Sequence, residues 1–198
     1  MIRLASNSAL KLESVRSILD SDMKLSYVNL MGENAGPSFN EVVGGVEMPL
    51  SHREILSTAN LRLQYLMDKY RSEIDTDFMV LESGLMRSRL QHRITVPDDK
   101  EVGEYCHHVT FGLYHKASTG EITILISTPI NIPLPYYQWC LAHPGQKLGT
   151  AIQSLDGADI PSSMELAYLT GNLHSRLGQL QEVVRGLFFS HGMIRSPV

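Results

Sequence analysis

Apolar and polar positions along the chain predict strands that alternate with helices. Residues 2–6, IRLAS, form a short apolar strand pattern, and residues 9–19 then space their apolar side chains near the helical period. Residues 25–30, LSYVNL, alternate well enough to predict a second strand. The stretch 32–45 is rich in Gly, Asn and Pro, and it predicts a loop that crosses the surface near a site.

The clearest helical signal begins at Ser51, because residues 51–70 contain neither Gly nor Pro. One face of this segment carries the apolar residues Ile55, Ala59, Leu63 and Leu66. Ser51 with Glu54 three residues later is a capping-box signature for the helix start. Residues 77–85, DFMVLESGL, predict a buried strand that ends at 82–84, and strand ends in α/β sheets are where sites are built.

The second half of the chain predicts a hairpin and two helices. Residues 105–126 contain two strand-like runs joined by the turn-like ASTG, whereas PINIPLP at 129–135 breaks the regular pattern. A helix is expected to begin near YYQWCLAH at 136–143, and another spans 173–189. These elements predict one domain over residues 1–198, an α/β fold with a mixed, mostly parallel central sheet flanked by helices and an antiparallel hairpin.

Composition narrows the class of protein. The 198 residues are 43% hydrophobic and 19% charged, which is typical of a folded globular chain rather than a disordered one. The net charge of −4 argues against nucleic acid as the main partner. No apolar run has the length of a membrane span, and residues 1–10 lack a secretory or mitochondrial presequence pattern. We therefore expect a cytoplasmic protein with no membrane partner, although an organellar location after removal of a presequence stays open.

The first candidate for chemistry is the turn formed by Ser6, Asn7 and Ser8 before the first predicted helix. A helix N-terminus presents free N–H groups and the positive end of a dipole, and Lys11 adds a full charge one turn later. Together these groups could bind a phosphate. The alternative is that one of the turn residues is only the N-cap and that Lys11 is a solvated helix residue.

A pair of carboxylates is the second candidate. Glu54 lies in the first turn of the long helix, and Glu82 follows the apolar run MVL, so the two could meet across a cleft and hold Mg²⁺ on a substrate's phosphates. A buried carboxylate is costly without a partner, so Glu82 should contact a metal, a cation or solvent. Glu54 has the alternative of serving only the capping box.

Two further groups of residues come from the second half of the chain. Arg176 begins the last predicted helix after the turn TGN and suits a bidentate phosphate contact, or else lies on an ordinary helix surface. A Cys₂His₂ zinc site from Cys106, His108, Cys140 and His143 is conceivable, but the spacing matches no established zinc pattern.

The order of these segments resembles the inosine/xanthosine triphosphatase family, which hydrolyses non-standard purine nucleoside triphosphates such as ITP and XTP in the presence of Mg²⁺. The similar segments are ASNSALKLESV (the family has A-T-T-N-P-x-K), SHREILSTANLR, VLESGL, IPLP followed by GQKLG, and LTGNLHSR with its closing helix. They span nearly the whole chain in the family's order. No single one is specific, so the resemblance rests on all five.

The resemblance implies a role for each candidate residue. Lys11 with Asn7 or Ser8 would bind the triphosphate, and Arg176 a substrate phosphate. Glu82 would bind Mg²⁺, or Mn²⁺ in its place, and Glu54 would bind the metal or the attacking water. His52, Gln64 and residues 32–48 are candidates for reading the base.

The chain also departs from the family pattern. Ser8 stands where the family has Asn, Asn7 comes one residue too early, and Thr58 replaces a Gly. The connection after the Glu82 strand, SRLQHRITVPDDKEVGE, is longer and more polar than the family's. Two hypotheses therefore follow, of which the first is favoured because the charged residues are retained. One is a Mg²⁺-dependent ITP/XTP hydrolase that cleanses the nucleotide pool, and the other is a catalytically silent ITPase-like domain that acts as an interaction module or a subunit of a larger assembly.

The resemblance further implies a homodimer. The aromatic residues Tyr136, Tyr137 and Trp139 could serve its interface, where such side chains are enriched, and packing within the core is the alternative role.

Overall fold

The computed structural model describes residues 1–22, 24–33, 45, 47–87 and 105–194. The strands are β1 (Ile2–Leu4), β2 (Leu30–Gly32), β3 (Asp77–Arg87), β4 (Tyr105–Lys116), β5 (Glu121–Ile126) and β6 (Ile130–Pro133). The helices are α1 (Ala9–Ser21), α3 (His52–Lys69), α4 (Leu134–Ala142), α5 (Leu148–Asp156), α6 (Glu165–Leu169) and α7 (Arg176–Ser190). No helix among the described residues is long and apolar enough to cross a membrane.

The described strands form one mixed sheet in the order β2-β1-β3-β4-β5, and β6 also pairs with β4. β1 runs parallel to β2 and β3, whereas β3, β4, β5 and β6 pair antiparallel to one another where they meet. The predicted hairpin at 105–126 is confirmed as β4 and β5. The α/β class with a mixed sheet flanked by helices is confirmed as well.

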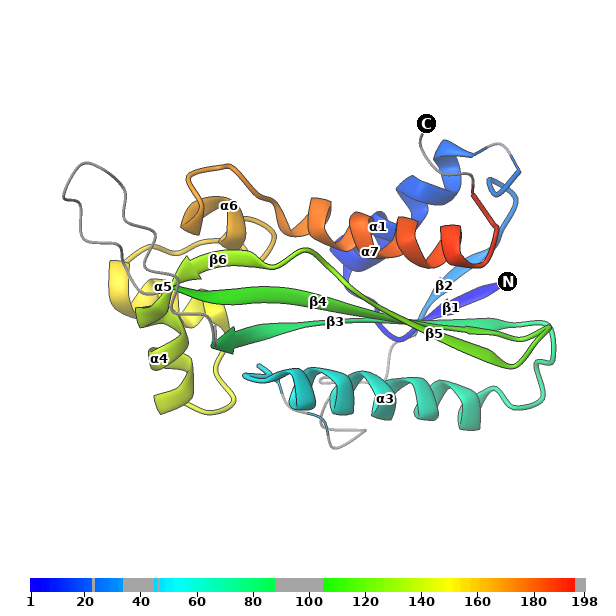
Figure 1. Ribbon diagram of the computed structural model, residues 1–198, viewed down its shortest axis with the longest axis horizontal. Coiled ribbons are helices and arrows are strands. Elements are labelled where there is room, and N and C mark those ends of the chain that lie inside the picture. Colours follow the sequence, from blue (N-terminus) through cyan, green and yellow to red (C-terminus); the bar gives the residue numbers. More distant parts are fainter. Residues whose placement is uncertain (23, 34–44, 46, 88–104, 195–198) are drawn as a thin grey trace.

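Helices cover both faces of the sheet (Figure 1). α1 and α7 lie on one face, where Met79, Leu81 and Tyr114 belong to their core cluster. α3 lies on the other face and packs against Phe78, Val80 and neighbouring residues of β4. Side chains of consecutive residues in β3 therefore point to opposite layers, as the strand period requires. A third cluster joins α4, α5 and α6 to β6 and to the ends of β3 and β4.

β1 is much shorter than its neighbour β3. Its pairing with β3 ends at Leu4 opposite Met79, and the N–H of Ala5 makes one further hydrogen bond to the carbonyl of Met79. β3 continues to Arg87 beside β4 alone. β2 also ends beside Leu4, so the sheet loses both strands from Val80 onwards, and α1 begins just beyond that point.

Three sequence predictions about strands need correction. The strand expected at 25–30 is a turn followed by β2 at Leu30–Gly32, because Asp22 accepts local hydrogen bonds from the backbone of residues 24–26. The strand expected to end at 82–84 runs to Arg87, so Glu82 lies within β3. The PINIPLP segment contains β6, whose fully buried Ile132 pairs with Cys106.

The helix predictions are confirmed in position. α3 follows Ser51 as its N-cap, and α4 and α7 occupy the segments expected near 136–143 and 173–189. Most of the predicted loop at 32–45 and the long connection after β3 lie outside the described residues.

Candidate active site

The turn that leads into α1 leaves the helix N-terminus open. Ser8 occupies the N-cap position, but its side chain makes no capping hydrogen bond. Its own N–H instead donates to Oγ of Ser6 at 3.1 Å. Asn7 and Ser8 are exposed. The first N–H groups of α1 and these polar side chains are therefore accessible to an anion.

Lys11 is buried, which contradicts the alternative that it is a solvated helix residue. It is 8% exposed, and its Nζ lies 3.8 Å from Oε2 of Glu82. Burial is the main cause that lowers the pKa of Lys11, to about 8. The charge of Glu82 acts against this shift, and the charges of Arg62 and Arg176 add to it. An ammonium group held in this way gains from a further anion.

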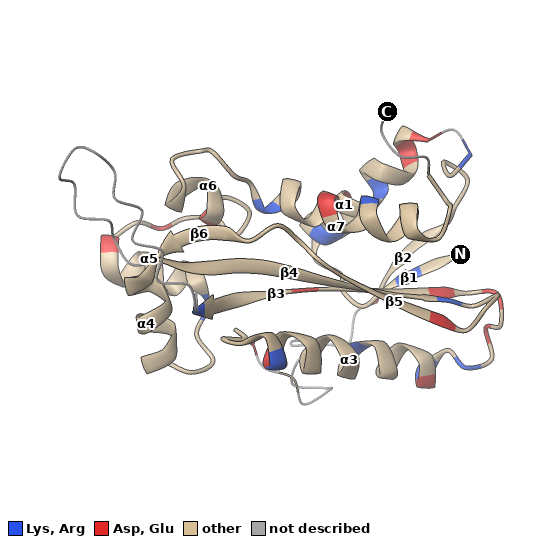
Figure 2. Ribbon diagram, in the orientation of Figure 1, with Lys and Arg blue, Asp and Glu red and all other residues tan. Residues whose placement is uncertain are grey.

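Glu82 has the cationic partners that its burial demands. It is 4% exposed, and Nε of Arg62 lies 3.2 Å from its Oε2. Arg62 is itself buried and donates from NH1 to the carbonyl of Ala5 at 3.3 Å, just past the end of β1. Lys11 comes from the α1 side of the sheet and Arg62 from the α3 side, and both reach Glu82 beyond the end of β1. Figure 2 shows acidic residues within the sheet and basic residues on α1, α3 and α7 around it.

Arg62 is the last residue of SHREILSTANLR, one of the segments similar to the triphosphatase family, in which it keeps the family's spacing from Glu54 but has no assigned role. An Arg in the middle of an amphipathic helix has a solvated side chain as its ordinary alternative, so periodicity gave no reason to place it in a site. Arg62 lies on α3 and Glu82 lies in β3, twenty residues later in the sequence, so their contact joins the helix layer to the sheet. Only the tertiary structure reveals it.

Glu54 caps the start of α3, which is the alternative role given for it in the sequence analysis. The Glu54 N–H donates to Oγ of Ser51 at 3.2 Å, and Oε2 of Glu54 accepts from the N–H of Leu50 at 2.7 Å. Glu54 precedes Arg62 by eight residues, a rise of about 12 Å along the helix. Its carboxylate would have to leave Leu50 and swing towards Glu82 to share a metal with it.

The residues present suit Mg²⁺ in part. Oε2 of Glu82 is buried beside the cations of Arg62 and Lys11, and neither contact has hydrogen-bond geometry, so a metal at this oxygen would have to be accommodated next to both. No group of three or more His, Cys, Asp or Glu side chains in the described ranges could hold a metal ion by itself. Mg²⁺ is commonly bound by one or two carboxylates together with substrate phosphates and water. Glu82 fits that role, with the remaining ligands supplied by a nucleotide.

Arg176 lies at the start of α7 and is not an ordinary surface residue. Its NH1 lies 3.7 Å from Oε2 of Glu165 and donates to the carbonyl of Ser162 at 3.4 Å, while its Nε is buried and makes no hydrogen bond. Its charge contributes to the lowered pKa values of Lys11 and His108. Arg176 is therefore close enough to Lys11 and His108 for its charge to act on both.

Glu165 connects Arg176 to the N-terminus of α5. A Cβ on Gly149 would lie 2.7 Å from Oε1 of Glu165, so a side chain there would displace the Glu165 carboxylate from its present position. Burial raises the pKa of Glu165, whereas the charge of Arg176 and the Gly149 N–H lower it. The GQKLG segment thus contains the N-terminus of α5, which is bound by the carboxylate of Glu165. The sequence alone did not indicate this contact.

A buried polar network lies between β4 and α7. The side-chain amide of Gln179 donates to the carbonyls of His108 at 3.0 Å and Thr128 at 3.2 Å, and its Oε1 accepts from Oγ1 of Thr110 at 3.1 Å. Nδ1 of His108 lies 2.8 Å from the same Oε1. Burial and the charge of Arg176 lower the pKa of His108 to about 3. His108 is a neutral core residue.

The four residues of the conceivable zinc site do not form one. His108 bonds Gln179, and His143 stacks on Trp139 with ring centroids 4.1 Å apart. Burial raises the pKa of Cys106 to about 12 and that of Cys140 to about 11, so both are protonated thiols in the α4–α5 core.

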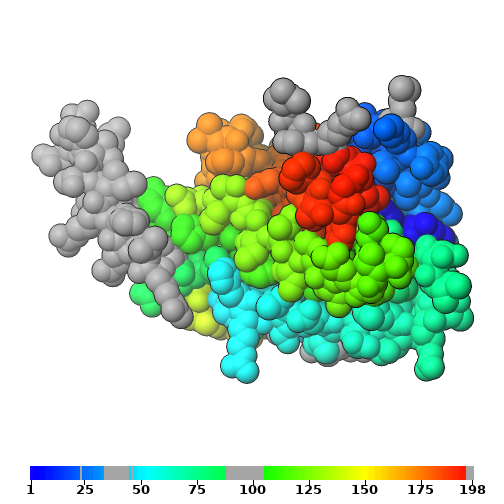
Figure 3. Space-filling view, turned by 45° about the vertical axis from the view of Figure 1, so that its right-hand side comes forward, coloured from blue at the N-terminus to red at the C-terminus, as the bar shows by residue number. Residues whose placement is uncertain are grey.

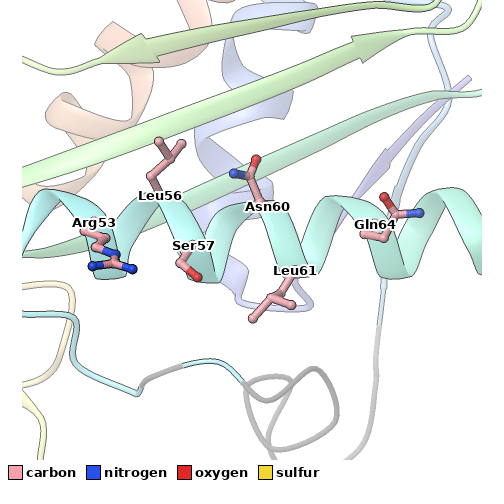
Figure 4. A pocket seen from close by; sticks show the side chains of 6 residues that line it. All are labelled: Arg53, Leu56, Ser57, Asn60, Leu61 and Gln64. Atoms are coloured by element: carbon pink, nitrogen blue, oxygen red, sulfur yellow. The ribbon is translucent and has the colours of Figure 1, made fainter.

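Two candidate base-reading residues lie on the outside of α3. Gln64 donates to Oδ1 of Asp68 at 3.0 Å, and the exposed His52 contacts the ring of Phe111 edge-on at 5.4 Å. Gln64 also lines a shallow hollow of about 460 Å³ (Figure 4). The hollow is lined by Arg53, Leu56, Ser57, Asn60, Leu61 and Gln64. None of these residues is among those that meet at Glu82, and residues 34–44 and 46 of the third candidate segment lie outside the described residues.

The aromatic residues considered for a dimer interface are half-buried within their own subunit. Tyr136 donates to Oδ2 of Asp156 at 2.6 Å, Trp139 donates to Oγ of Ser154 at 3.0 Å, and all three pack on the α4–α5 core. The contacts of these three residues are therefore those of side chains packed on the core of their own subunit.

Comparison with known proteins adds evidence on the fold. No protein-family profile matches the chain, and no curated protein matches it in sequence. Among solved structures, the chain is similar to the crystal structure of protein VC0702 from Vibrio cholerae, with a TM-score of 0.67 and 13% sequence identity. The match covers 96% of this chain and 95% of that one. The likeness therefore extends over the whole α/β fold, and at this identity it shows the fold alone.

Proposed function

We propose that the protein is a Mg²⁺-dependent hydrolase of non-standard purine nucleoside triphosphates such as ITP and XTP. The observation that carries the proposal is the meeting of Lys11 and Arg62 at the buried carboxylate of Glu82, beside the open N-terminus of α1. Cations and free N–H groups suit a polyphosphate, and a buried carboxylate suits a metal or a water nucleophile. The choice of ITP and XTP rests on the family resemblance of the five segments.

Each residue has a separate task in the proposed reaction. Lys11 and the first N–H groups of α1 bind phosphate oxygens, and Arg176 binds another part of the triphosphate. Arg62 holds Glu82 in position through their 3.2 Å contact, and Glu82 would hold the metal together with phosphate oxygens and water, one of which is the attacking water. When bound, Mg²⁺ or Mn²⁺ supplies neutralisation of charge on the phosphate oxygens.

Base selection follows from polar groups that pair with the 6-oxo edge of hypoxanthine or xanthine. A site built to pair with such a group strongly rejects analogues that lack it. We therefore expect turnover of ITP and XTP to exceed that of ATP.

The second candidate function is a catalytically silent ITPase-like domain that binds other proteins. Two observations favour it. Glu54 is engaged at the start of α3, and the Thr58 side chain is fully buried where the resembled family has a glycine. In an active site of that family, the engagement of Glu54 would remove a ligand for the metal or the water, and the Thr58 side chain would fill space.

The experiment that separates the two functions is release of phosphate and pyrophosphate from ITP, XTP, dITP, ATP and GTP in parallel with Mg²⁺. The Glu82→Gln variant removes the carboxylate charge, and Glu13→Gln, an exposed position on α1, is the matched control. The hydrolase proposal predicts turnover of ITP or XTP that survives in the control and disappears in Glu82→Gln. Folding of each variant is checked by thermal unfolding.

Two outcomes contradict the hydrolase. Folded protein that hydrolyses none of the nucleotides supports the silent domain, and the search then moves to binding partners. Turnover that persists unchanged in Glu82→Gln removes this residue from the mechanism.

A further inference from the structure

Arg176 and Glu165 form a loose ion pair. NH1 of Arg176 lies 3.7 Å from Oε2 of Glu165, which is too far for a hydrogen bond. The same NH1 donates to the carbonyl of Ser162 at 3.4 Å, and the buried Nε has no hydrogen-bond partner in the described part of the chain. A guanidinium group carries five N–H donors. Most of those of Arg176 are therefore unused by the described residues.

A second arginine of the chain shows what a tight pair looks like. Arg3 donates from Nε and NH2 to the two carboxylate oxygens of Glu73, at 2.8 and 2.7 Å. In this bidentate geometry the carboxylate fixes the orientation of the guanidinium group. Glu165 makes neither of these bonds to Arg176. It therefore compensates the charge of Arg176 without holding its N–H groups in one direction.

The carboxylate of Glu165 has a second anchor at the start of α5. The side chain of Glu165 is buried, and the N–H of Gly149 in the first turn of α5 donates to it. Lys147, the N-cap residue of α5, lies close enough for its charge to act on the same carboxylate. The N-terminus of a helix stabilises a negative charge. Glu165 can therefore stay in place when Arg176 turns to another anion.

Arg176 is accessible to a ligand from its present position. Its side chain is 24% exposed, and its charge acts on Lys11. Figure 3 shows the orange surface of α6 and of the turn before α7, on the opposite side of the green strands from α3 in cyan. A phosphate group accepts two parallel N–H bonds from a guanidinium, whereas Glu165 accepts none from Arg176. A polyphosphate held by Lys11 therefore attracts Arg176 away from Glu165.

We infer that Glu165 is an internal competitor for Arg176, which neutralises this guanidinium group until a phosphate group of the substrate binds it. The inference rests on the proposed function, because it takes Arg176 as a ligand of the substrate's phosphates. In the ligand-free protein the charge of Glu165 weakens the attraction of Arg176 for anions. When phosphate binds, Arg176 exchanges one loose ion pair for two hydrogen bonds, and Glu165 keeps the N–H of Gly149. The contact is autoinhibitory and lowers the affinity of the site.

The first test is calorimetric titration with inorganic pyrophosphate in the absence of divalent metal, so that phosphate contacts are measured without turnover. Glu165→Gln keeps an oxygen for the Gly149 N–H and removes the charge that faces Arg176. The Kd for pyrophosphate should fall by about 5-fold or more, the ratio to which an ion pair of about 1 kcal/mol corresponds. Glu121→Gln, at an exposed position of β5, changes the net charge equally and should bind as the wild-type chain does.

A double-mutant cycle tests whether the gain depends on Arg176. Arg176→Gln alone should weaken binding of pyrophosphate. In that background Glu165→Gln should have no further effect, because the cation for which it competes is absent. A gain of the same size in both backgrounds would assign the effect of Glu165 to the general field of the site and would overturn the inference.

The Nε–H group of Arg176 gives a readout in the wild-type chain, which does not depend on the folding of a variant. Its proton signal in nitrogen-labelled protein is assigned by its loss in Arg176→Lys. The signal should move downfield and exchange more slowly with water when pyrophosphate is added, because Nε gains an acceptor. The Nε–H of Arg3 already donates to Glu73, so its signal should stay in place.

Two further results would overturn the inference. Weaker binding of pyrophosphate by folded Glu165→Gln shows that Glu165 positions Arg176 for the ligand instead of competing with it. Unchanged affinity with an unmoved Arg176 signal shows that Arg176 binds no phosphate. If either result accompanies turnover of ITP, the competitor fails and the hydrolase stands. A chain that hydrolyses no nucleotide but binds pyrophosphate more tightly in Glu165→Gln loses the proposed reaction and keeps the competitor.

Discussion

Gln179 determines which nitrogen of His108 carries the proton. Its amide nitrogen donates to two carbonyls, so its Oε1 must act as the acceptor, and Nδ1 of His108 at 2.8 Å must be the donor. The hydroxyl of Thr110 donates to the same oxygen and therefore accepts from Ser83, whose Oγ lies 2.7 Å away. One glutamine thus orders the polar groups between β4 and α7.

Replacing Gln179 by Leu should destabilise the protein strongly. The change leaves two carbonyls, one hydroxyl and one imidazole N–H buried without their partner, and each such loss costs about 1–3 kcal/mol. We expect a total loss of at least about 3 kcal/mol in urea unfolding. Gln181→Leu removes a single bond to Oγ of Ser17 and should cost about 1 kcal/mol. Equal losses in the two variants would contradict the network.

His108 should remain neutral in mildly acidic solution. Its pKa in the fold is about 3, against 6.5 for the free side chain, so between these values the unfolded state binds more protons than the folded state. The contribution of His108 to stability is therefore complete above 6.5 and is lost as the pH falls towards 3. Nitrogen NMR of labelled protein should show an Nδ1–H tautomer that does not titrate between about pH 8 and pH 5. Titration near pH 6.5 would contradict the buried, bonded geometry.

Lys11 should make nucleotide binding sensitive to alkaline pH. Its pKa is lowered to about 8, so a growing fraction of its charge disappears as the pH rises through that value. Affinity for ITP, measured by calorimetry in the Glu82→Gln background to prevent turnover, should fall between about pH 7 and pH 9. Loss of the Glu82 charge itself lowers the Lys11 pKa, so the fall should begin earlier in this background than in the wild-type chain.

Lys11→Arg is the matched variant, because arginine keeps its charge throughout this range. Its affinity should stay constant across the same pH series. A parallel fall in both proteins would assign the pH dependence to another group. The effect of pH on stability should run in the opposite direction to its effect on affinity. The unfolded chain holds the Lys11 proton up to pH 10.5, whereas the folded chain loses it near pH 8, so stability should rise between these two values.

Gly112 should tolerate no side chain. A Cβ there would lie 2.3 Å from Cγ1 of Val183 and 2.8 Å from Cδ1 of Leu187, so α7 could not pack on β4 at its present distance. Gly112→Ala should cost about 1–3 kcal/mol in thermal or urea unfolding.

Gly178→Ala is the control for this change, since its Cβ would meet only Oγ of Ser175 at 3.1 Å within α7. Alanine favours a helix over glycine by up to about 1 kcal/mol, so this variant should be neutral or more stable. If both alanine variants changed stability in the same direction and by the same amount, close packing at Gly112 would not be the cause.

Local signals made α1, α3, α4 and α7 predictable, whereas α5 and α6 were not expected from the sequence. Ser51 and Glu54 mark the start of α3 through contacts within four residues: Oγ of Ser51 caps the Glu54 N–H as predicted, whereas the Glu54 carboxylate accepts from the N–H of Leu50 rather than from that of Ser51. β6 was missed because the prolines that flank it are typical of irregular segments, yet Pro133 closes an edge strand where its missing N–H is tolerated. β2 was misplaced because an alternating pattern cannot compete with the local hydrogen bonds of Asp22.

The candidate site was only partly predictable, for a different reason. The sequence indicates that Glu82 requires a partner, because a carboxylate after an apolar run is costly when buried. It cannot name Arg62, which meets Glu82 only after two layers assemble. Gln179 and Glu165 are likewise ordinary polar residues until their distant partners, His108 and Gly149, are brought to them.

The early end of β1 allows charged side chains from the two faces of the sheet to come together. A complete sheet insulates the helices on one face from those on the other, and its hydrogen-bonded strands leave no path for a side chain. Beyond Leu4 both β1 and β2 have ended, and through that opening Lys11 and Arg62, anchored on opposite faces, share a single carboxylate oxygen of Glu82. A shift of α3 that moves Arg62 must therefore change the electrostatic environment of Lys11 on α1. An insertion that lengthened β1 by two residues would close the opening and separate the two charges.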